Sequence, residues 1–301
     1  MYCVVVSESL HATCADWLNE RTNMVRSDYR QTERLRAVLA EANGLVIGTY
    51  TKINEALLTA APKLRVVGRA GVGLENVDLT ACRQSGVRVV YTPEANTHAV
   101  AEYVIALMLD ALRPRVTIGP DVDAETFHRF RRELIGTQLD TLTLGILGLG
   151  RIGRRVSRIA HGLGMTVLAH DLLPPDQLRQ RIDHPVQFVD QATLLGESDV
   201  LTVHVDGRPE NRHLLNQSRL SQLKPGCLLI NTSRGMVIDS ADLAAWARIA
   251  VDTGGRAVLD VHEPEPIPPP SPQTYPLYGL SNVRLLPHIA SRTSKALENM
   301  S

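Results

Sequence analysis

The chain has 301 residues, of which 44% are hydrophobic and 21% are charged, an ordinary composition for a globular protein with room for two modest domains. The 32 basic residues balance the 32 acidic residues, so no net charge attracts nucleic acid or an anionic membrane. We therefore expect neither as a partner, and an anionic ligand would have to be held by local groups.

The cysteines are Cys3, Cys14, Cys82 and Cys227, which form no CxxC pair and have no histidines at metal-binding spacing. This argues against a disulfide framework and a structural metal site, and it fits a reducing, cytoplasmic setting. The chain's first residues lack a basic region followed by a long apolar core, and no stretch reaches the roughly 18 apolar residues that span a bilayer. We expect no bound metal, export signal or membrane anchor.

Short runs rich in β-branched residues recur along the chain, with segments of helical period between them. The runs are YCVVV, GLVIG, LRVVG and VRVVY in the first third, then LTLGIL, MTVLAH, DVLTVHV, CLLINT, RAVLDV and VRLLP. Strands that alternate with helices predict parallel sheets built from βαβ units. Two sets of strands predict two α/β domains, and the apolar segment 97–112 is predicted to be the helix that joins them.

One segment is predicted to be an exposed loop. Between Glu263 and Pro276 the prolines stand at positions 264, 266, 268, 269, 270, 272 and 276. Proline lacks the backbone N–H that helices and central strands require, so neither element can form here.

The sequence TLTLGILGLGRIGRRV contains a GxGxxG pattern directly after an apolar strand and at the start of an amphipathic helix. Gly148 allows the tight turn, Gly150 lets a pyrophosphate approach the backbone, and Gly153 lets the helix pack closely on the strand. The amides of Arg151 and Ile152 then face the phosphates at the positive end of the helix. The pattern predicts a dinucleotide site; the alternative is a tight turn without a ligand.

The next strand, MTVLAHD, ends in Asp171, 18 residues beyond Gly153. A carboxylate at this position can accept hydrogen bonds from the ribose hydroxyls and would repel a 2′-phosphate. NAD is therefore favoured over NADP. The alternative is that Asp171 only caps a helix, and Arg151 is a complication because it could reach a phosphate.

Three further polar segments follow predicted strands. They are INTSRG with Arg234, LDVHEPEP with Asp260 and Glu265, and LPHIAS with His288. Each residue alone is explained equally well as a surface or loop residue. Because doubly wound sheets bind ligands at the carboxyl edge, their joint placement downstream of a dinucleotide motif predicts an active site.

At these positions the sequence resembles the D-isomer-specific 2-hydroxyacid dehydrogenase family, from about Leu45 to Met300. The motifs in the family's order are GRAGVGLENVDL, NTHAVAEYVIALML, LGILGLGRIGRRV, KPGCLLINTSRGMVID, AVLDVHEPEP and LLPHIA. The resemblance implies a flavodoxin-like substrate domain, residues 1–95 and 292–301, and an inserted Rossmann-type NAD-binding domain, residues 96–291, both with doubly wound parallel sheets. It also implies hydride transfer between NAD and C2 of a small 2-hydroxy or 2-oxo acid.

The resemblance assigns roles to the catalytic candidates. The planar fork of Arg234 can hold a carboxylate oxygen and the C2 oxygen of the substrate. His288 exchanges the hydroxyl proton, as general base in oxidation and general acid in reduction, and it also contacts the substrate. Glu265 should pair with His288 and favour its protonated form. Glu263 is also acidic, but its spacing does not match.

The resemblance also implies binding residues. The turn that contains Arg69, Val72 and Gly73 resembles the family's carboxylate-binding turn, although it could be an ordinary glycine-rich turn. Asp260 should face the nicotinamide carboxamide. Further cofactor contacts are implied at Thr97, His204, Val205, Asn211, Thr232 and Ser233. The helix that begins at Thr97 supports a homodimer in the family, although an apolar helix is equally well explained as core.

The chain departs from the family at three places. Its motifs are most like those of phosphoglycerate dehydrogenases, but Gly48 stands where that group has an arginine that helps to bind a phosphate. Asp206, Gly207 and Arg208 replace the family's usual Pro-Leu loop, and Arg208 is compatible with a substrate contact or with a surface position. Finally, the sequence stops at Ser301, so the helix that returns to the first domain should be short.

Two alternative functions stay open. A formate or phosphite dehydrogenase shares this architecture; formate enzymes have an amide where Glu265 stands, which argues against formate, while arginine and histidine suit any small oxyanion. The other alternative is an NAD-sensing, corepressor-like protein that keeps the site but acts through partners.

Overall fold

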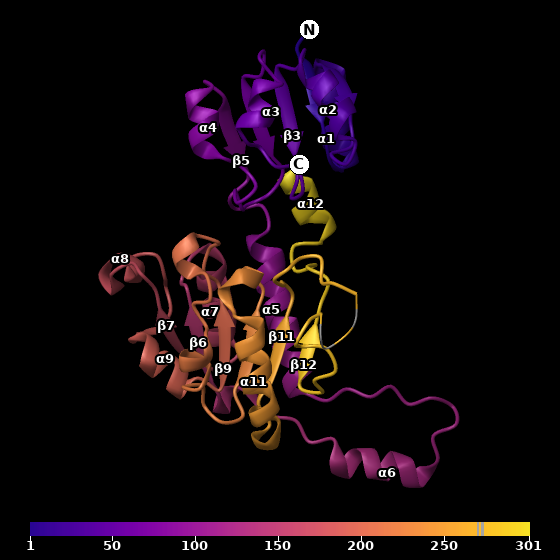
Figure 1. Ribbon diagram of the computed structural model, residues 1–301. Coiled ribbons are helices and arrows are strands. Elements are labelled where there is room, and N and C mark those ends of the chain that lie inside the picture. The colour runs from indigo at the N-terminus through magenta and orange to yellow at the C-terminus, as the bar shows by residue number, and fades with distance from the viewer. Residues whose placement is uncertain (270, 272–273) are drawn as a thin grey trace. The chain divides into compact units, whose positions relative to one another are not determined.

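The computed structural model describes residues 1–269, 271 and 274–301. The chain divides into two compact units, one made of Met1–Ala99 and Ser291–Ser301 and the other of Val100–Ala290. Each unit is built around its own parallel sheet (Figure 1). The first unit is therefore discontinuous in sequence, and the second unit is inserted into it.

The described residues of the first unit form a five-stranded parallel sheet in the order β2-β1-β3-β4-β5. The strands are β1 (Cys3–Val6), β2 (Asn23–Arg26), β3 (Gly44–Ile47), β4 (Val66–Arg69) and β5 (Arg88–Tyr91). The helices are α1 (Ala12–Arg21), α2 (Thr32–Leu39), α3 (Glu55–Thr59), α4 (Leu79–Gln84) and α12 (Ser294–Met300). This strand order is flavodoxin-like, as expected, and its topological switch point lies between β1 and β3.

The C-terminal helix α12 belongs to the first unit. The backbone N–H of His11 donates to Oγ of Ser301 at 3.1 Å, and Sγ of Cys14 lies 3.7 Å from the carbonyl oxygen of Glu298. Both His11 and Cys14 lie at the start of α1. The short helix expected to return to the first domain is thus present and packs beside α1.

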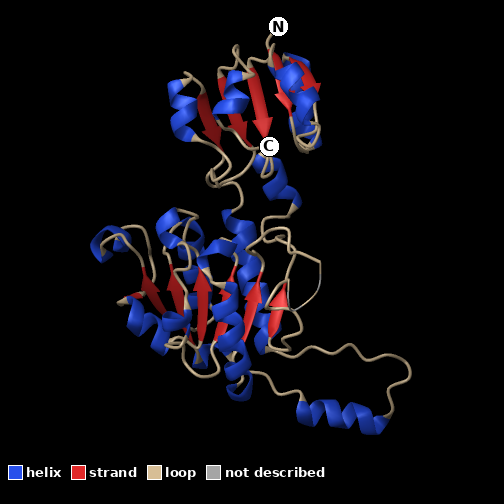
Figure 2. Cartoon of the chain, viewed as in Figure 1, coloured by secondary structure: helices blue, strands red, loops and turns tan. Residues whose placement is uncertain are grey.

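The described residues of the second unit form a seven-stranded parallel sheet in the order β12-β11-β10-β9-β6-β7-β8 (Figure 2). Its strands are β6 (Thr143–Leu147), β7 (Thr166–His170), β8 (Gln187–Phe188), β9 (Val200–Val203), β10 (Leu228–Asn231), β11 (Arg256–Leu259) and β12 (Val283–Leu285). Its α-helices are α5 (Thr97–Leu112, which begins in the first unit), α6 (Ala124–Glu133), α7 (Arg151–Gly162), α8 (Pro175–Arg179), α9 (Gln191–Glu197), α10 (Gln217–Leu220) and α11 (Ser240–Ala250). Short 3-10 turns are η1 (Leu139–Thr141), η2 (Pro209–Asn211), η3 (Gly235–Val237) and η4 (Val251–Thr253). The order confirms the predicted Rossmann-type sheet, in which strands are added on one side of β6 up to β8 and then on its other side from β9 to β12.

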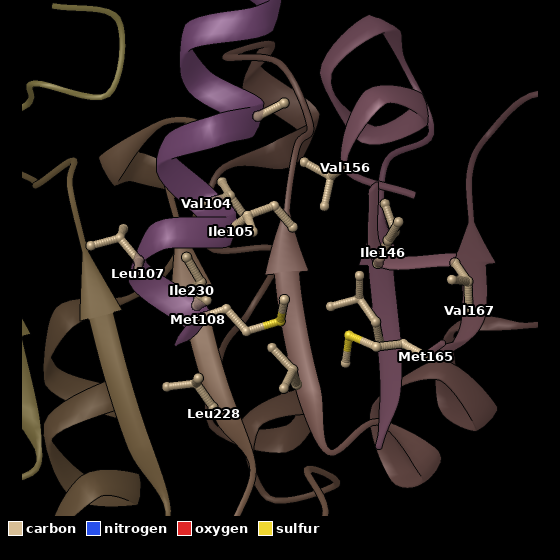
Figure 3. Packing of buried hydrophobic residues seen from close by; sticks show 14 of the residues in the cluster. Val104, Ile105, Leu107, Met108, Ile146, Val156, Met165, Val167, Leu228 and Ile230 are labelled. Carbon is tan, nitrogen blue, oxygen red and sulfur yellow. The ribbon is translucent and has the colours of Figure 1, made fainter. Parts of the chain in front are cut away.

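The two faces of this sheet form separate apolar clusters because side chains alternate along each strand. Ile146 packs with residues of α5 and α7, whereas its neighbour Leu147 packs with residues of α9 and α11. On the first face, Val104 and Met108 of α5 lie over the strands (Figure 3). The predicted joining helix therefore exists at the predicted residues, and its apolar side chains are part of the core of the second unit.

The chain between α5 and η1 leaves the body of the second unit and returns to it. We call this segment, residues 113–138, the arm. Its base is closed by the N–H of Thr137, which donates to the carbonyl oxygen of Leu112 at 2.9 Å. Its helix α6 has no buried residue and lies away from the sheet (Figure 1). Exposed apolar side chains of the arm are Val116, Ile118, Phe127, Leu134 and Ile135.

The predicted strands are all present, but the sequence did not reveal β2, β8 or α6. These elements are short or polar: β2 reads NMVR, β8 has two residues, and half of the residues of α6 are charged. None of them carries the apolar run or wide apolar face that makes an element visible in a sequence.

The proline-rich segment contains neither helix nor strand in its described residues, as predicted. Pro270 and Pro272 lie outside the described residues. The expectation of full exposure was wrong at Tyr275, which is 1% exposed and packs in the core beside α11. Its aromatic ring supplies enough apolar area to draw the end of the loop inward. No helix in the described part of the chain has the length and apolar character needed to cross a membrane.

Candidate active site

The GxGxxG segment forms an open backbone cradle at the start of α7. Gly148 has φ of 96°, and a Cβ on it would lie 2.9 Å from the carbonyl of His204. A Cβ on Gly153 would lie 2.2 Å from the carbonyl oxygen of Gly148, so only glycine lets helix and turn approach this closely. A Cβ on Gly150 would meet no atom within 4 Å, and this residue caps α7 without a side-chain hydrogen bond. The space and the N-terminal amides, which include those of Arg151 and Ile152, suit a pyrophosphate.

Asp171 lies directly after β7 and contacts this cradle. One carboxylate oxygen accepts from the N–H of Leu149 at 2.6 Å and the other from Leu173 at 2.9 Å. The turn is also tied to β7 by the N–H of Gly148, which donates to the carbonyl oxygen of His170 at 2.9 Å. The acidic residue predicted to read the ribose is therefore held beside the phosphate cradle by two backbone hydrogen bonds.

The residues after β9 form a loop that is bonded to itself. Arg208 donates to both carboxylate oxygens of Asp206, with Nε at 2.7 Å and Nη2 at 2.5 Å. The buried Asn211 donates to the same carboxylate at 2.9 Å. The hydrogen bonds from Arg208 lower the pKa of Asp206. The structure thus gives Arg208 a loop-stabilising contact, a role that the sequence left open.

His204 and Val205 begin this loop beside Gly148. Nε2 of His204 lies 3.0 Å from Oγ1 of Thr202. Burial lowers the pKa of His204 to about 3, so this ring is neutral at neutral pH. It is therefore a hydrogen-bonding group rather than a proton donor.

The turn that carries Arg234 is organised by Asn231, a residue at the end of β10 that the sequence analysis missed. Oδ1 of Asn231 accepts from the N–H of Ser233 at 3.0 Å and its hydroxyl at 2.8 Å, while Nδ2 donates to the carbonyl oxygen of Arg234 at 3.0 Å. The buried hydroxyl of Thr232 has no hydrogen-bond partner among the described residues. An unsatisfied buried hydroxyl is costly, and a bound ligand would satisfy it.

The catalytic candidates Glu265 and His288 lie together, although 23 residues separate them. Nδ1 of His288 lies 2.5 Å from Oε1 of Glu265, and their side chains are 38% and 32% exposed. Burial acts to raise the pKa of Glu265, but the hydrogen bond and charge of His288 outweigh it and hold this pKa below its ordinary value. The predicted acid–base pair therefore has the geometry of an ion pair.

Asp260 fixes the backbone on which His288 stands. Its fully buried carboxylate accepts from the N–H of Ile289 at 3.0 Å and that of Ala290 at 2.8 Å. His288 has φ of 56°, a left-handed conformation that costs a residue with a side chain about 1–3 kcal/mol. Burial raises the pKa of Asp260, against the opposing effect of these hydrogen bonds. Beyond the cofactor contact expected of it, Asp260 thus holds the His288 turn in place.

Two more residues, His262 and Glu263, stabilise this edge of the sheet. The sequence analysis did not select His262, and it set Glu263 aside because of its spacing. Nε2 of the buried His262 lies 2.6 Å from the carbonyl oxygen of Leu286, joining the ends of β11 and β12. Glu263 is bonded to Nη1 of Arg212 at 2.5 Å and to Nε2 of His213 at 3.2 Å. In the sequence, only the motif DVHEPE indicated His262 and Glu263, because the residues that they contact lie far away along the chain.

In the first unit, Arg69 ends β4 and the glycine-rich turn follows it. The N–H of Gly71, which has φ of 148°, donates to the carbonyl oxygen of Arg69 at 2.9 Å and to Oγ1 of Thr92 at 3.1 Å. The amides of Val72 and Gly73 come next in the turn. Thr97 is the first residue of α5, and its N–H donates to the carbonyl oxygen of Glu94 at 3.2 Å.

Known proteins are similar to this chain in sequence and in fold. Residues 105–290 match the sequence model of the NAD binding domain of D-isomer specific 2-hydroxyacid dehydrogenases. The chain is 35% identical to D-3-phosphoglycerate dehydrogenase of Archaeoglobus fulgidus, over 99% of this chain and 55% of that protein. It is 32% identical to hydroxypyruvate reductase of Thermotoga maritima, over 98% of this chain and 93% of that protein. The crystal structure of the TT0316 protein from Thermus thermophilus is similar with a TM-score of 0.83 and 32% identity, over 99% of this chain and 93% of that one.

The fold, the cradle and these similarities define an NAD-linked α/β protein of two units. The chain belongs to the D-isomer specific 2-hydroxyacid dehydrogenase family, as its motifs indicated, and its second unit is an NAD-binding domain. It spans about half the length of the phosphoglycerate dehydrogenase but nearly all of the reductase.

The Glu265–His288 pair predicts a pH-dependent contribution to stability. Because the pKa of folded Glu265 lies below its ordinary value of 4.5, the carboxylate stabilises the fold above that pH. The contribution is lost as the pH falls through the lowered pKa. Parent and Glu265→Gln should therefore differ most in free energy of unfolding near pH 5.5 and converge towards pH 3.

Urea unfolding measures this difference. Fluorescence of Trp246 in a Trp17→Phe background reports on the second unit, since the chain has 2 tryptophans and Trp17 lies in the first unit. Glu210→Gln, at an exposed site of the same unit, is the matched control. A difference between parent and Glu265→Gln that stays constant from pH 5.5 to 3 would contradict the ion pair.

Proposed function

We propose that the protein is an NAD-dependent D-2-hydroxyacid dehydrogenase, or 2-oxoacid reductase, acting on a small 2-hydroxy or 2-oxo acid. The Glu265–His288 pair carries this proposal, because it sets a carboxylate-supported imidazole on the sheet edge that also bears the phosphate cradle. A general acid or base beside a nicotinamide site suits the interconversion of an alcohol and a ketone. Membership of the family supports the same reaction.

Each catalytic candidate of the second unit has its own proposed role in the reaction. The glycine-rich cradle and Asp171 would hold NADH, which would supply the hydride for C2 of the oxo acid. His288 gives its proton to the C2 oxygen in reduction and takes it back in oxidation, while the carboxylate of Glu265 holds Nδ1 of the ring. Arg234 holds the substrate carboxylate and polarises the C2 oxygen. Arg69 and the amides of Val72 and Gly73 in the first unit bind the substrate as well.

A turnover assay tests the proposal directly. NADH absorbance is followed with glyoxylate, pyruvate, hydroxypyruvate and bulkier 2-oxo acids, and NAD reduction with formate and phosphite. We expect at least one 2-oxo acid to be reduced. His288→Ala should lower kcat/KM for that acid at least about 100-fold, the scale of losing a general acid, without weakening NADH binding.

The matched control is His128→Ala, which changes an exposed histidine of the arm. Turnover of phosphite or formate alone would favour the dehydrogenases that share this architecture. NADH binding without any turnover would favour an NAD-sensing, corepressor-like role. A His288→Ala variant within about threefold of the parent would remove histidine from the proposed chemistry.

The role proposed for Arg234 depends on its planar fork. Arg234→Lys keeps the charge but offers a single donor point to two oxygens that lie in one plane. We expect the loss of kcat/KM to appear mainly as a raised KM for the oxo acid. Arg248→Lys, on the far end of α11, is the control. A near-normal kcat/KM of Arg234→Lys would show that a group other than Arg234 binds the substrate carboxylate.

For the cofactor site, we propose that Asp171 reads the adenosine ribose, with Thr97, His204, Val205, Asn211, Thr232, Ser233 and Asp260 as further contacts. Asp171→Ala should weaken NAD binding and, by removing a negative charge, narrow the preference over NADP. Fluorescence titration with both cofactors measures the two dissociation constants. Asp176→Ala, exposed on α8, serves as the control. Equal dissociation constants in the parent would refute the role of Asp171.

We propose that the residues of the first unit form the substrate domain, and that the protein works as a homodimer in a reducing, cytoplasmic compartment. All four cysteines are free, which fits that compartment. The proposed dimer interface does not include the apolar side chains of α5 that pack in the core. It is formed by the arm, where Ile135 is 80% and Phe127 41% exposed. Exposed apolar groups gathered on a projecting segment favour contact with a second copy.

Sedimentation equilibrium tests the dimer. The double change Phe127→Asp and Ile135→Asp should shift the protein from dimer to monomer at micromolar concentration, because buried carboxylates oppose association. Ile249→Asp, at a residue 75% exposed on α11, should leave the assembly unchanged. A parent that sediments as a monomer would disprove the proposal.

A further inference from the structure

His213 lies where three loops of the second unit meet. It belongs to the loop that follows β9, and its backbone N–H donates to the carbonyl oxygen of Met236 at 2.8 Å, in the turn that follows β10. Nε2 of its ring lies 3.2 Å from Oε2 of Glu263, in the loop that follows β11. Because β9, β10 and β11 are neighbours in the sheet, this one residue joins the loops of three adjacent strands.

Two of these loops carry catalytic candidates. The turn after β10 contains Arg234, and the loop after β11 contains Glu265. A Cβ on Gly235 would overlap the carbonyl group of His262, so the two loops are in direct contact. The histidine at their junction contacts each loop two residues away from the catalytic candidate.

The ring of His213 lies between two carboxylates. Nδ1 is 3.1 Å from Oδ2 of Asp239, the N-cap residue of α11, and Nε2 faces Glu263. Arg212 binds the other carboxylate oxygen of Glu263 at 2.5 Å. A carboxylate oxygen only accepts hydrogen bonds, whereas an imidazolium has a donor on each nitrogen. The arrangement therefore matches the charged ring, and a neutral ring would donate to only one of the two carboxylates.

The backbone of His213 points to a functional constraint on this junction. Its φ of 51° lies in the left-handed region, which residues with a side chain rarely adopt. In the described part of the chain, His213 and His288 are the residues other than glycine with a positive φ. One of them is bonded to Glu263 and the other to Glu265, so a strained histidine binds each of these two carboxylates of the loop after β11. Strained residues persist where the surrounding structure holds them, and they cluster at functional sites.

We propose that His213 is a positioning residue that acts through Glu263 on the loop after β11. By fixing this loop, it keeps the carboxylate of Glu265 on Nδ1 of His288. The inference rests on the proposed function, because it adds a residue to the same reaction. His213 itself transfers no proton, so its loss should slow the reaction and leave cofactor binding unchanged.

The first experiment uses His213→Asn. Asparagine tolerates the left-handed conformation better than most residues with a side chain, so the variant does not add backbone strain. Its shorter side chain cannot contact both carboxylates. We expect kcat/KM for the 2-oxo acid that the parent reduces to fall about tenfold, mainly through kcat, as for a catalytic group that is slightly misplaced. The Kd of NADH should stay within about twofold of the parent.

The titration of Glu265 is a readout that a merely structural role would not move. Burial acts to raise the pKa of Glu265, and the hydrogen bond and charge of His288 hold it below its ordinary value of 4.5. In His213→Asn the pair should loosen, so the midpoint of the Glu265 titration should rise towards that value. Carbon-13 NMR of the carboxyl group measures the midpoint, and the signal is identified by its absence from Glu265→Gln.

His184→Asn is the matched control in the same unit. Both ring nitrogens of His184 also have partners, since Nε2 lies 2.6 Å from Oγ of Ser157 and Nδ1 lies 3.2 Å from Oδ1 of Asp183. Ser157 belongs to α7, and neither partner is in a loop that carries a catalytic candidate. This variant should lose stability in urea without moving the Glu265 midpoint, and its kcat/KM should stay within about twofold of the parent.

Glu263→Gln breaks the same ion pair from its other side. It leaves the left-handed residue unchanged, and it tests the proposal even if His213→Asn does not fold. Its loss of kcat/KM should match that of His213→Asn, and the double variant should lie within about twofold of either single one, because both changes remove one contact. Trp246 fluorescence in the Trp17→Phe background reports whether the second unit of each variant is folded.

The outcomes separate this inference from the proposed function. A folded His213→Asn with the kcat/KM and the Glu265 midpoint of the parent overturns the inference and leaves the proposed function standing. Equal losses of kcat/KM in His213→Asn and His184→Asn, or losses that add fully in the double variant, also overturn it. If the parent reduces no 2-oxo acid but the Glu265 midpoint rises in His213→Asn, the proposed function fails and the link between His213 and the pair stands.

Discussion

The buried carboxylate of Asp260 makes the contacts on which the position of the Glu265–His288 pair in the second unit depends. It lies beyond the end of β11 with no exposed surface, and its two oxygens accept the N–H groups of Ile289 and Ala290. A buried carboxylate without partners would be very costly, so these two bonds are obligatory. They hold His288 in a left-handed conformation that its side chain disfavours, and this brings Nδ1 of the ring to Glu265. The pair therefore depends on a second carboxylate, that of Asp260, which takes no part in it.

Hydrogen bonds from backbone N–H groups to a side-chain oxygen also hold other loops at the edges of the two sheets. Asn231 bonds the turn that carries Arg234, Asp171 bonds the glycine-rich cradle, and Glu8 bonds the loop after β3. In each case a side-chain oxygen accepts backbone N–H groups that the end of a strand leaves unpaired. The loops are thus held by hydrogen bonds from backbone N–H groups to side-chain oxygens, while the apolar clusters of Ile146 and Leu147 fix the strands beneath them. Ordered loops on a rigid sheet are what a site for a small, polar substrate requires.

The sequence by itself determined the alternation of strands and helices and the glycine-rich turn before α7, and it indicated Arg234, Glu265 and His288 as catalytic candidates. These features are visible because each is local: an apolar run, three glycines at fixed spacing, or a polar residue in the loop that follows a strand. The elements that the sequence did not predict, β2, β8 and α6, lack such a strong local apolar pattern. The burial of Tyr275 was missed because it depends on core residues that are distant in the sequence.

Only the tertiary structure decided which polar groups support the site. The hydrogen bonds that Asp260 accepts from Ala290, Glu263 from His213 and Glu8 from Thr51 span 30, 50 and 43 positions in the chain. No spacing rule connects such residues, because the parallel sheet brings together strand ends that whole βαβ units separate. A carboxylate acquires its role from the amides that face it in space. The sequence therefore supplied the reactive groups, and the fold selected the residues that hold them in position.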